Sequence, residues 1–312
     1  MPDTSGLPAR RAALKLLDAV LRRGETLENA EVAAMRGVGA PADRALARAI
    51  AGEVLRWLAD LDAVIDSATK TNLPDDAKPR TVLRMMLAQW LRLDTPPHAV
   101  IATALPLLAG GPRRLAHGVF SALHKRGVAL PSVPTLPAEI AARWGERAAA
   151  IAAGLAAPPP LDLTLRDPAK TREWAEKLGG VSLAAGHVRL ARGSSVADLA
   201  GYTNGAWWVQ DFAASLPARL LGSGEGRRAL DLCAAPGGKA LQLASAGWQV
   251  TAIDKSDKRL DRLRDNLRRT RLDAKIWIAD ALTWEPAEPF DAILLDAPCT
   301  ATGTCRRHPD VL

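Results

Sequence analysis

The sequence predicts a multidomain protein in which an all-α bundle precedes a small α+β insert and a doubly wound α/β domain. Residues 8–130 repeat apolar side chains at three-to-four spacing, with no alternating strand pattern between them. Two proline-rich breaks follow, at residues 131–137 and 158–160. From residue 228 onward, short apolar strands alternate with helices around a glycine-rich turn, which indicates a parallel sheet.

The first 135 residues are expected to form the all-α bundle. Apolar side chains of residues 12–20 recur at helical spacing, with basic residues between them. A second helix begins after the start signals Pro41 and Asp43. The same periodicity predicts further helices over residues 61–68, 80–93 and 98–108.

Residues 136–225 are expected to hold a linker helix and a small α+β subdomain. The linker helix covers residues 138–157, and the alternating segment 161–165 is typical of a strand. The remaining pieces are a helix at 169–178, short apolar segments at 188–190 and 207–209, and a helix at 212–221.

Residues 226–312 are expected to form the N-terminal part of an α/β domain. The predicted strands are 229–233, 249–253, 275–279 and 292–295, with helices at 237–246 and 258–269. The chain stops in an expected helix after the fourth strand. Because four strands leave the sheet incomplete and its last strand unpaired, we expect the chain to be a fragment of a longer protein.

Composition favours a globular protein with a polyanionic partner. Hydrophobic residues make up 48 % and charged residues 24 % of the chain, and no apolar run approaches the ~20 residues that cross a bilayer, so a cytoplasmic monomer is expected. The net charge is +7, and residues 1–150 hold 20 Lys and Arg against 15 Asp and Glu. The N-terminal half is therefore the better candidate for an RNA-binding surface, although a solvated basic exterior is the alternative.

The three cysteines, Cys233, Cys299 and Cys305, are too few and too unevenly spaced for a disulfide framework. None has the CxxC spacing of metal sites, and the five histidines do not cluster with them. Neither disulfides nor a metal site is expected.

Each predicted strand of the α/β domain ends at or near an aspartate: Asp231, Asp254, Asp280 and Asp296. Ligands of open parallel sheets bind beyond the carboxyl ends of the strands. One such aspartate is commonly a helix N-cap, but four in register indicate a cofactor of the nucleoside type. Asp254 is expected at the ribose hydroxyls and Asp280 at the adenine edge.

A glycine-rich turn follows the first of these strands, with the residues Cys233, Ala234, Ala235, Pro236, Gly237, Gly238 and Lys239. Paired glycines let the backbone approach a ligand, and the following helix N-terminus favours a negative group. The turn matches neither the P-loop nor the dinucleotide-binding glycine pattern, which disfavours a phosphate cradle. Lys239 supplies one cation, enough for a carboxylate such as that of methionine.

The segment from Asp296 to Cys299 follows the fourth strand. Pro298 forces a non-helical turn there, and we expect this turn to direct Cys299 into the cofactor cleft. A cysteine suits pyrimidine chemistry, because C5 of cytosine is not nucleophilic until a thiolate adds to C6. The alternative is that Cys299 is a small buried hydrophobe.

Together these motifs resemble the RNA (cytosine-5)-methyltransferases, in the RsmB/Sun branch that acts on small-subunit ribosomal RNA. The helical half resembles the NusB-like RNA-binding domain, so the resemblance covers essentially the whole chain. The segments that carry it are 231–239, Asp254, Asp280, 296–303 with 306–309, 208–211, 43–48, 53–57 and 61–63.

The resemblance implies a Rossmann-like domain that uses S-adenosylmethionine, bound or bordered by residues 233–239, Asp254, Asp280 and Asp296. Asp296 is expected to hydrogen-bond the cytosine ring. The resemblance also implies that Cys299 is the second cysteine, which assists product release. The family's nucleophile lies in a Thr-Cys motif on a later strand, expected beyond Leu312, and Thr304-Cys305 is interpreted as a local substitution. The chain alone is therefore expected to bind the cofactor weakly and to lack activity.

Two other function classes stay open. One is a non-catalytic RNA-binding protein with a vestigial methyltransferase domain. The other is a small-molecule methyltransferase, which Cys299 and the basic N-terminal half disfavour. The predicted helix at 258–269 and its end carry Arg262, Arg264, Arg268, Arg269 and Arg271. These arginines either contact RNA or form the solvated outer face of a helix packed on the sheet.

Overall fold

The computed structural model describes residues 6–191 and 195–312, which fall into two compact units. The helical unit comprises the chain up to Pro158 together with Thr300–Leu312, and the sheet unit comprises Pro159–Cys299. The boundaries expected at residues 135 and 225 stay a prediction, since these units divide elsewhere. None of the described helices is long and apolar enough to span a membrane.

Seven helices of the helical unit confirm the predicted all-α character. Their ends follow local signals: Pro41 begins α3, and Gly24 ends α1 in the left-handed conformation, where its N–H donates to the carbonyl of Ala19. The sequence periodicity did not single out the second or the last of the seven. They are α1 (Leu7–Arg23), α2 (Leu27–Ala34), α3 (Pro41–Arg56), α4 (Leu58–Asp66), α5 (Lys78–Arg92), α6 (Pro97–Ala104) and α7 (Gly110–Lys125).

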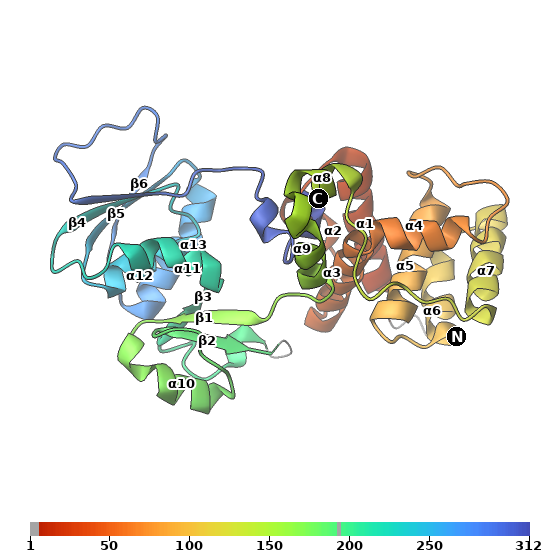
Figure 1. Cartoon of the computed structure of the whole chain (residues 1–312), viewed down its shortest axis with the longest axis horizontal. Coiled ribbons are helices and arrows are strands. Elements are labelled where there is room, and N and C mark those ends of the chain that lie inside the picture. The colour runs from red at the N-terminus through yellow and green to blue at the C-terminus, as the bar shows by residue number, and fades with distance from the viewer. Residues whose placement is uncertain (1–5, 192–194) are drawn as a thin grey trace. The chain divides into compact units, whose positions relative to one another are not determined.

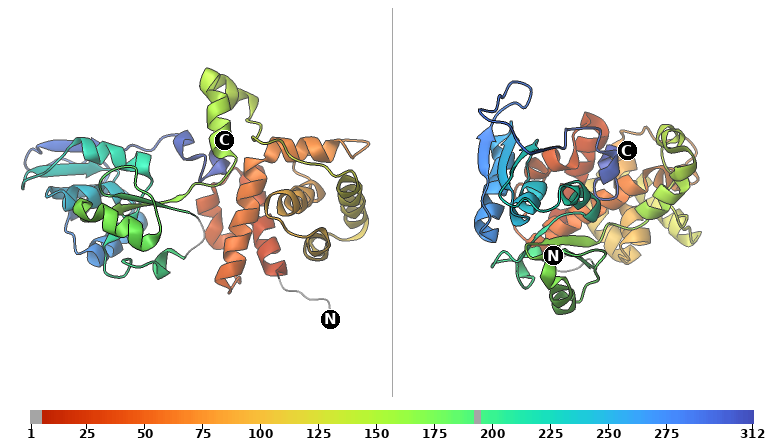
Figure 2. Two further views of the ribbon diagram at one scale, coloured as in Figure 1. Left: turned by 60° about the horizontal axis from the view of Figure 1, so that its bottom comes forward. Right: turned by 60° about the vertical axis from the view of Figure 1, so that its left-hand side comes forward.

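The core of this unit lies around α5, which packs against α3, α4, α6 and α7. Figure 1 and Figure 2 show α1, α3 and α5 side by side. The helix α5 is buried on nearly all sides from Arg80 to Gln89. Trp57, Leu83 and Phe120 are fully buried in the same cluster. The buried apolar area, rather than helix propensity, therefore holds these helices together.

The predicted single helix over residues 138–157 is wrong in one respect. The structure has two helices there, α8 (Ala138–Trp144) and α9 (Ala148–Leu155), joined by a short 3-10 turn. The break falls at Gly145, whose φ of 52° lies in the left-handed region. A glycine adopts that conformation without steric cost, so it ends α8.

The residues Thr300–Leu312 pack on the helical unit, against α3. Arg56 donates from Nη2 to the carbonyl of Arg306 at 2.8 Å. The N–H of Leu27 donates to Asp310 Oδ2 at 2.9 Å, at the first turn of α2. The helix expected after the fourth strand is wrong, because this segment forms only two 3-10 turns, at Thr302–Thr304 and Pro309–Val311.

The sheet unit contains the predicted α+β insert, built on a three-stranded antiparallel sheet of order β2-β1-β3. Buried Asp162 ties its parts together, since it accepts from Arg189 Nε at 2.7 Å and from the N–H of Phe212 at 3.0 Å. The elements are β1 (Leu161–Leu165), α10 (Thr171–Leu178), β2 (His187–Leu190), β3 (Trp207–Val209) and α11 (Phe212–Leu220).

The second sheet of this unit is parallel and has the order β6-β5-β4-β7, which confirms the predicted α/β fold (Figure 1). Along β4, Ala229 and Asp231 point to one face, where Ala229 packs in a cluster with Leu241 of α12 and Leu263 of α13. On the opposite face Ile293 is 60 % exposed. The elements are β4 (Arg228–Leu232), α12 (Gly238–Ser245), β5 (Gln249–Asp254), α13 (Asp257–Thr270), β6 (Lys275–Ile278) and β7 (Ala292–Leu295).

The strand order places a switch point between β4 and β7. From β4 the chain adds β5 and then β6 on one side, and it returns to the other side of β4 with β7. The carboxyl ends of β4 and β7 are adjacent, because Leu232 pairs with Leu295 in the parallel register. Such a point is where ligands of open α/β sheets bind.

Candidate active site

The motif loop, residues 233–239, joins β4 to α12. Cys233 turns the chain with a φ of 61°, and the N–H of Ala234 donates to the carbonyl of Ile253 at 2.9 Å. Gly237 has a φ of 107° and caps α12. A Cβ there would lie 2.4 Å from Leu263 Cδ1, so packing against α13 excludes larger residues as well.

Gly238 is close to Gln210, since a Cβ on Gly238 would lie 3.2 Å from Gln210 Cδ. Protein side chains therefore occupy the space beside both glycines. Gln210 is itself buried and held by three partners: it accepts from Trp208 Nε1 at 2.9 Å, and its Nε2 donates to Gln242 Oε1 at 2.6 Å and to the carbonyl of Ala214 at 3.4 Å. The sequence singled out segment 208–211 by resemblance but assigned no role to Gln210.

Asp231 is 1 % exposed and lies beneath α12, whose residue Ala240 donates a backbone hydrogen bond to it. Its Oδ2 is buried without a hydrogen-bond partner among the described residues. Burial raises the pKa of Asp231 from 3.8 to about 7, although the positive charge of Lys239 acts in the opposite direction. A carboxyl with this pKa exchanges its proton near neutral pH.

Asp254 is 4 % exposed and fastens the motif loop to the end of β5. Its Oδ2 accepts from the N–H of Ala235 at 3.2 Å, and its Oδ1 accepts from the N–H of Ser256 at 2.9 Å. Arg259, on the first turn of α13, closes the same loop: its Nη2 donates to the carbonyl of Ala235 at 2.6 Å, and its Nη1 lies 3.7 Å from Asp254 Oδ2. Sequence reasoning missed Arg259, because it looks like any outer-face arginine of a helix.

Lys239 and Asp296 are brought together at the switch point. Lys239 Nζ lies 2.6 Å from Asp296 Oδ2, with 15 % and 62 % of the two side chains exposed. The backbone helps to align the partners, since the N–H of Asp296 donates to the carbonyl of Leu232 at 3.4 Å. The cation that we expected to face a cofactor carboxylate is thus paired with the carboxylate after β7.

Asp280 is exposed and its side chain acts locally. Its Oδ1 accepts from the N–H of Leu282 at 2.9 Å, and its carbonyl accepts from the N–H of Trp284 at the same distance. This is the geometry of a turn cap. In the structure Asp280 therefore stabilises the turn that follows β6.

The three cysteines have different surroundings. Cys299, at the end of the sheet unit, is an exposed thiol. Cys233, in the motif loop, is partly buried, and this burial raises the pKa of its thiol. Cys305 is 6 % exposed in the helical unit, and burial raises the pKa of its thiol as well. A nucleophile needs thiolate character, which the burial of Cys305 disfavours; the interpretation of Thr304-Cys305 as a local substitution stays a prediction.

Two family models match the chain: the NusB family over residues 7–109, and the 16S rRNA methyltransferase RsmB/F family over residues 218–312. The ribosomal RNA small subunit methyltransferase B of Xanthomonas campestris pv. campestris is 34 % identical over 99 % of this chain and 76 % of its own length. This chain belongs to the ribosomal RNA small subunit methyltransferase B family. The protein of the same name from Pseudomonas putida is also 34 % identical, over 97 % of this chain and 76 % of its own length.

Membership of the small subunit methyltransferase B family confirms the resemblance in the strand-end motifs and in the helical half. Among solved structures, the crystal structure of PH0851 has a TM-score of 0.66 over 98 % of this chain and 77 % of its own, at 18 % identity. That likeness concerns the fold. Within residues 6–191 and 195–312, no group of three or more His, Cys, Asp or Glu side chains is arranged to hold a metal ion.

Proposed function

We propose that this family member methylates C5 of a cytosine in small-subunit ribosomal RNA, with S-adenosylmethionine as the methyl donor. The relatives that match nearly the whole chain are named as methyltransferases of that RNA. The structural observation that carries the proposal is the contact between Lys239 and Asp296. It joins the motif loop to the segment that ends in Cys299, so one edge of the sheet holds both.

S-adenosylmethionine supplies an electrophilic methyl group when bound. The polar groups around residues 233–239 fit its recognition: the N-terminus of α12 suits its carboxylate. Asp254 suits the ribose hydroxyls, because each of its oxygens accepts one backbone N–H and keeps a second lone pair. Asp280 suits the adenine edge. The partnerless Oδ2 of buried Asp231 also supports a polar ligand group at this loop.

The chain's own residues receive distinct tasks in this proposal. Asp296 hydrogen-bonds the cytosine ring, and Lys239 holds the Asp296 carboxylate in place. A thiolate adds to C6 of cytosine, which makes C5 nucleophilic, and a base removes the C5 proton after methyl transfer. We assign Cys299 to the last stage, in which the thiolate leaves C6 and the product is released. Because C5 and C6 of a stacked and paired cytosine cannot be reached inside a helix, the target cytosine must be unpaired or flipped out.

The helical unit is proposed to hold the RNA. It contains the NusB family match and most of the basic half of the chain, where Lys and Arg exceed Asp and Glu by 20 to 15 over residues 1–150. Phosphate contacts from such a surface supply affinity that falls as salt rises. They do not select a nucleotide, so the choice of cytosine rests with the sheet unit.

The proposed reaction is tested in cells from which the gene is deleted. Bisulfite sequencing of their small-subunit ribosomal RNA is expected to show the loss of one 5-methylcytosine. The wild-type gene should restore it, and a gene with Asp296→Ala should not. Asp273→Ala, at an exposed aspartate before β6, is the matched control and should restore the signal.

An unchanged 5-methylcytosine pattern in the deletion strain would overturn the proposed reaction. If the purified chain then still bound the RNA, the non-catalytic RNA-binding protein would be the better description. Methylation of another base, seen by nucleoside analysis, would overturn the assignment to cytosine.

A further inference from the structure

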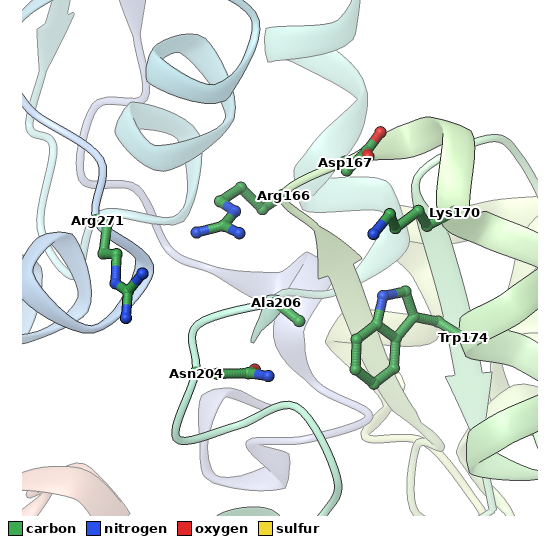
Figure 3. A pocket seen from close by; sticks show the side chains of 7 residues that line it. All are labelled: Arg166, Asp167, Lys170, Trp174, Asn204, Ala206 and Arg271. Carbon is green, nitrogen blue, oxygen red and sulfur yellow. The ribbon is translucent and has the colours of Figure 1, made fainter.

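A basic cavity of about 300 Å³ lies in the sheet unit, away from the motif loop. Its volume is at the lower end of the range for small-molecule and nucleotide-sized sites. It forms where the turn after β1 and the loop before β3 meet the C-terminal end of α13. The residues that line it are Arg166, Asp167, Lys170, Trp174, Asn204, Ala206 and Arg271 (Figure 3). We call it the Arg166 pocket.

The side chain of Arg166 is held beside the chain segment that carries Arg271. Arg166 donates from Nη1 to the carbonyl of Thr270 at 2.9 Å, and Thr270 directly precedes Arg271. The backbone N–H of Arg166 also donates to the carbonyl of Ala206 at 2.9 Å. A guanidinium has five donors, so the bond to Thr270 orients the group while using one of them.

Arg271 occupies a backbone position that favours glycine or asparagine. It ends α13 with a φ of 55°, in the left-handed region. That conformation costs a side-chain-bearing residue about 1 kcal/mol. A glycine would adopt this conformation without steric cost, whereas here the position carries a basic side chain.

The charge of the Arg166 pocket is strongly positive. Arg166, Lys170 and Arg271 face one carboxylate, and that carboxylate is engaged: Asp167 Oδ1 accepts from the N–H of Ala169 at 3.0 Å. Figure 3 shows the Arg166 guanidinium extending toward the side of Arg271 and the Lys170 ammonium lying near Trp174, with the Asp167 carboxylate pointing away from both. Three cations against one carboxylate leave a net positive charge, which fits a phosphate group.

The remaining wall indicates a nucleotide rather than a bare anion. Trp174 is 7 % exposed, with its ring packed over Gly201 and under the Lys177 ammonium at 4.7 Å, so it offers a rigid apolar wall. Asn204 adds an exposed amide that can donate and accept. Because Lys170, Asn204 and Arg271 are all exposed, a polymer can pass through the pocket without being enclosed.

We infer that the Arg166 pocket binds the ribose-phosphate backbone of the substrate RNA, at a nucleotide separate from the methylated base. The inference rests on the proposed function, which makes RNA the substrate. The pocket then acts as a positioning site: it fixes the RNA strand on the sheet unit while the helical unit holds another part. The arginines in and after α13 therefore differ in their surroundings. Arg271 lines the Arg166 pocket, whereas Arg264 forms ion pairs with Asp257 and Asp261.

The test measures binding of a fluorescein-labelled single-stranded fragment of small-subunit ribosomal RNA to the full chain. The double variant Lys170→Gln/Arg271→Gln is expected to weaken binding about tenfold. It should also reduce the slope of log affinity against log salt by about 0.7 to 1.4, the value for one or two phosphate contacts on a single strand. If lysine instead of glutamine replaces Arg271, the positive charge is kept, and the slope of log affinity against log salt should return most of the way to the wild-type value.

The matched control is Arg172→Gln/Arg268→Gln, which removes the same charge from side chains that are 91 % and 78 % exposed and do not line the pocket. Its affinity is expected to stay within about twofold of wild type. Equal losses in both double variants would mean general electrostatics and would overturn the inference. A second outcome would also overturn the inference. If the pocket variant no longer bound cytidine monophosphate by calorimetry but bound RNA with wild-type affinity, the pocket would be a site for small anions.

The experiments distinguish a failure of the inference about the Arg166 pocket from a failure of the proposed function. If gene deletion leaves 5-methylcytosine in the ribosomal RNA, the proposed function fails whatever the pocket variants do. If deletion removes the 5-methylcytosine but the pocket variant binds RNA as the wild type does, only the inference about the Arg166 pocket fails.

Discussion

The aspartates at the ends of the inner strands of the parallel sheet differ in burial from those that follow the outer strands. The inner strands β4 and β5 end in Asp231 and Asp254, which are 1 % and 4 % exposed and lie on the face that α12 and α13 cover. The outer strands β6 and β7 are followed by Asp280 and Asp296, which are exposed. Identical positions in the sequence pattern thus include two buried carboxylates and two that are open to solvent.

The comparison shows that burial, and not the position after a strand, decides the hydrogen bonding and the charge state of each carboxylate. The inner pair bonds to backbone N–H groups, and the charge of Asp231 is suppressed near neutral pH. The outer pair is solvated, so ion pairs and turn caps there contribute little stability. Stability effects should therefore concentrate in the inner strands, whereas changes at Asp296 should affect the RNA reaction more than stability.

The largest expected effect is on the pH dependence of stability, through Asp231→Asn. The folded-state pKa of Asp231, about 7, lies above its ordinary value of 3.8, so the folded protein binds more protons than the unfolded one between these values. The free energy of unfolding of the wild type therefore falls as pH rises from about 4 to about 7, by about 4 kcal/mol from this group. The asparagine variant lacks this fall.

Urea unfolding of both proteins at pH 5 and pH 8 checks the prediction. The variant should gain stability relative to the wild type at pH 8. Parallel pH dependences of the two proteins would show that Asp231 stays ionised in the fold.

Asp254→Ala should have the next largest effect. It leaves the N–H groups of Ala235 and Ser256 without their acceptor in a buried place. We expect a loss of about 2 to 3 kcal/mol in the free energy of unfolding, and weaker binding of S-adenosylmethionine by calorimetry. Asp254→Asn keeps one acceptor oxygen and should lose about half as much; equal losses would contradict this account of the loop.

The smallest effect on stability is expected at the outer strand, from Asp296→Asn. In the ion pair with Lys239, the Asp296 side chain is 62 % exposed to solvent. The free energy of unfolding should therefore change by less than about 1 kcal/mol. Methylation in the complementation assay should nevertheless be lost. A loss of stability comparable to that of Asp254→Ala would remove the distinction between inner and outer strands.

Local patterns in the sequence predicted much of the fold. Alternation and short apolar runs placed all the strands within about a residue, and the paired glycines marked the loop before α12. These features depend on neighbouring residues, which a sequence displays directly. The different burial of Asp231 and Asp280 could not be predicted in the same way, because it depends on which strands become central.

Long-range partners are the other part that the sequence did not reveal. Arg259 reaches Ala235 from the next helix, and Asp60 in α4 accepts from Thr135 in the proline-rich linker at 2.6 Å. No local periodicity identifies such pairs. The break of the linker helix at Gly145 has a visible signal, since an isolated glycine in a helix is unfavourable, but the apolar pattern on both sides of it predicts a continuous helix.

The return of Thr300–Leu312 to the helices has a consequence for the order of folding. The sheet unit is an insertion within the helical unit, since the chain leaves the helical unit after Pro158 and rejoins it at Thr300. During synthesis, the partners of Asp310 and Arg306 on α2 and α3 emerge long before those residues do. Residues 300–312 can therefore dock on α2 and α3 only after β4, β5, β6 and β7 have been translated. Such a late, non-local contact forms slowly and depends on the inserted unit.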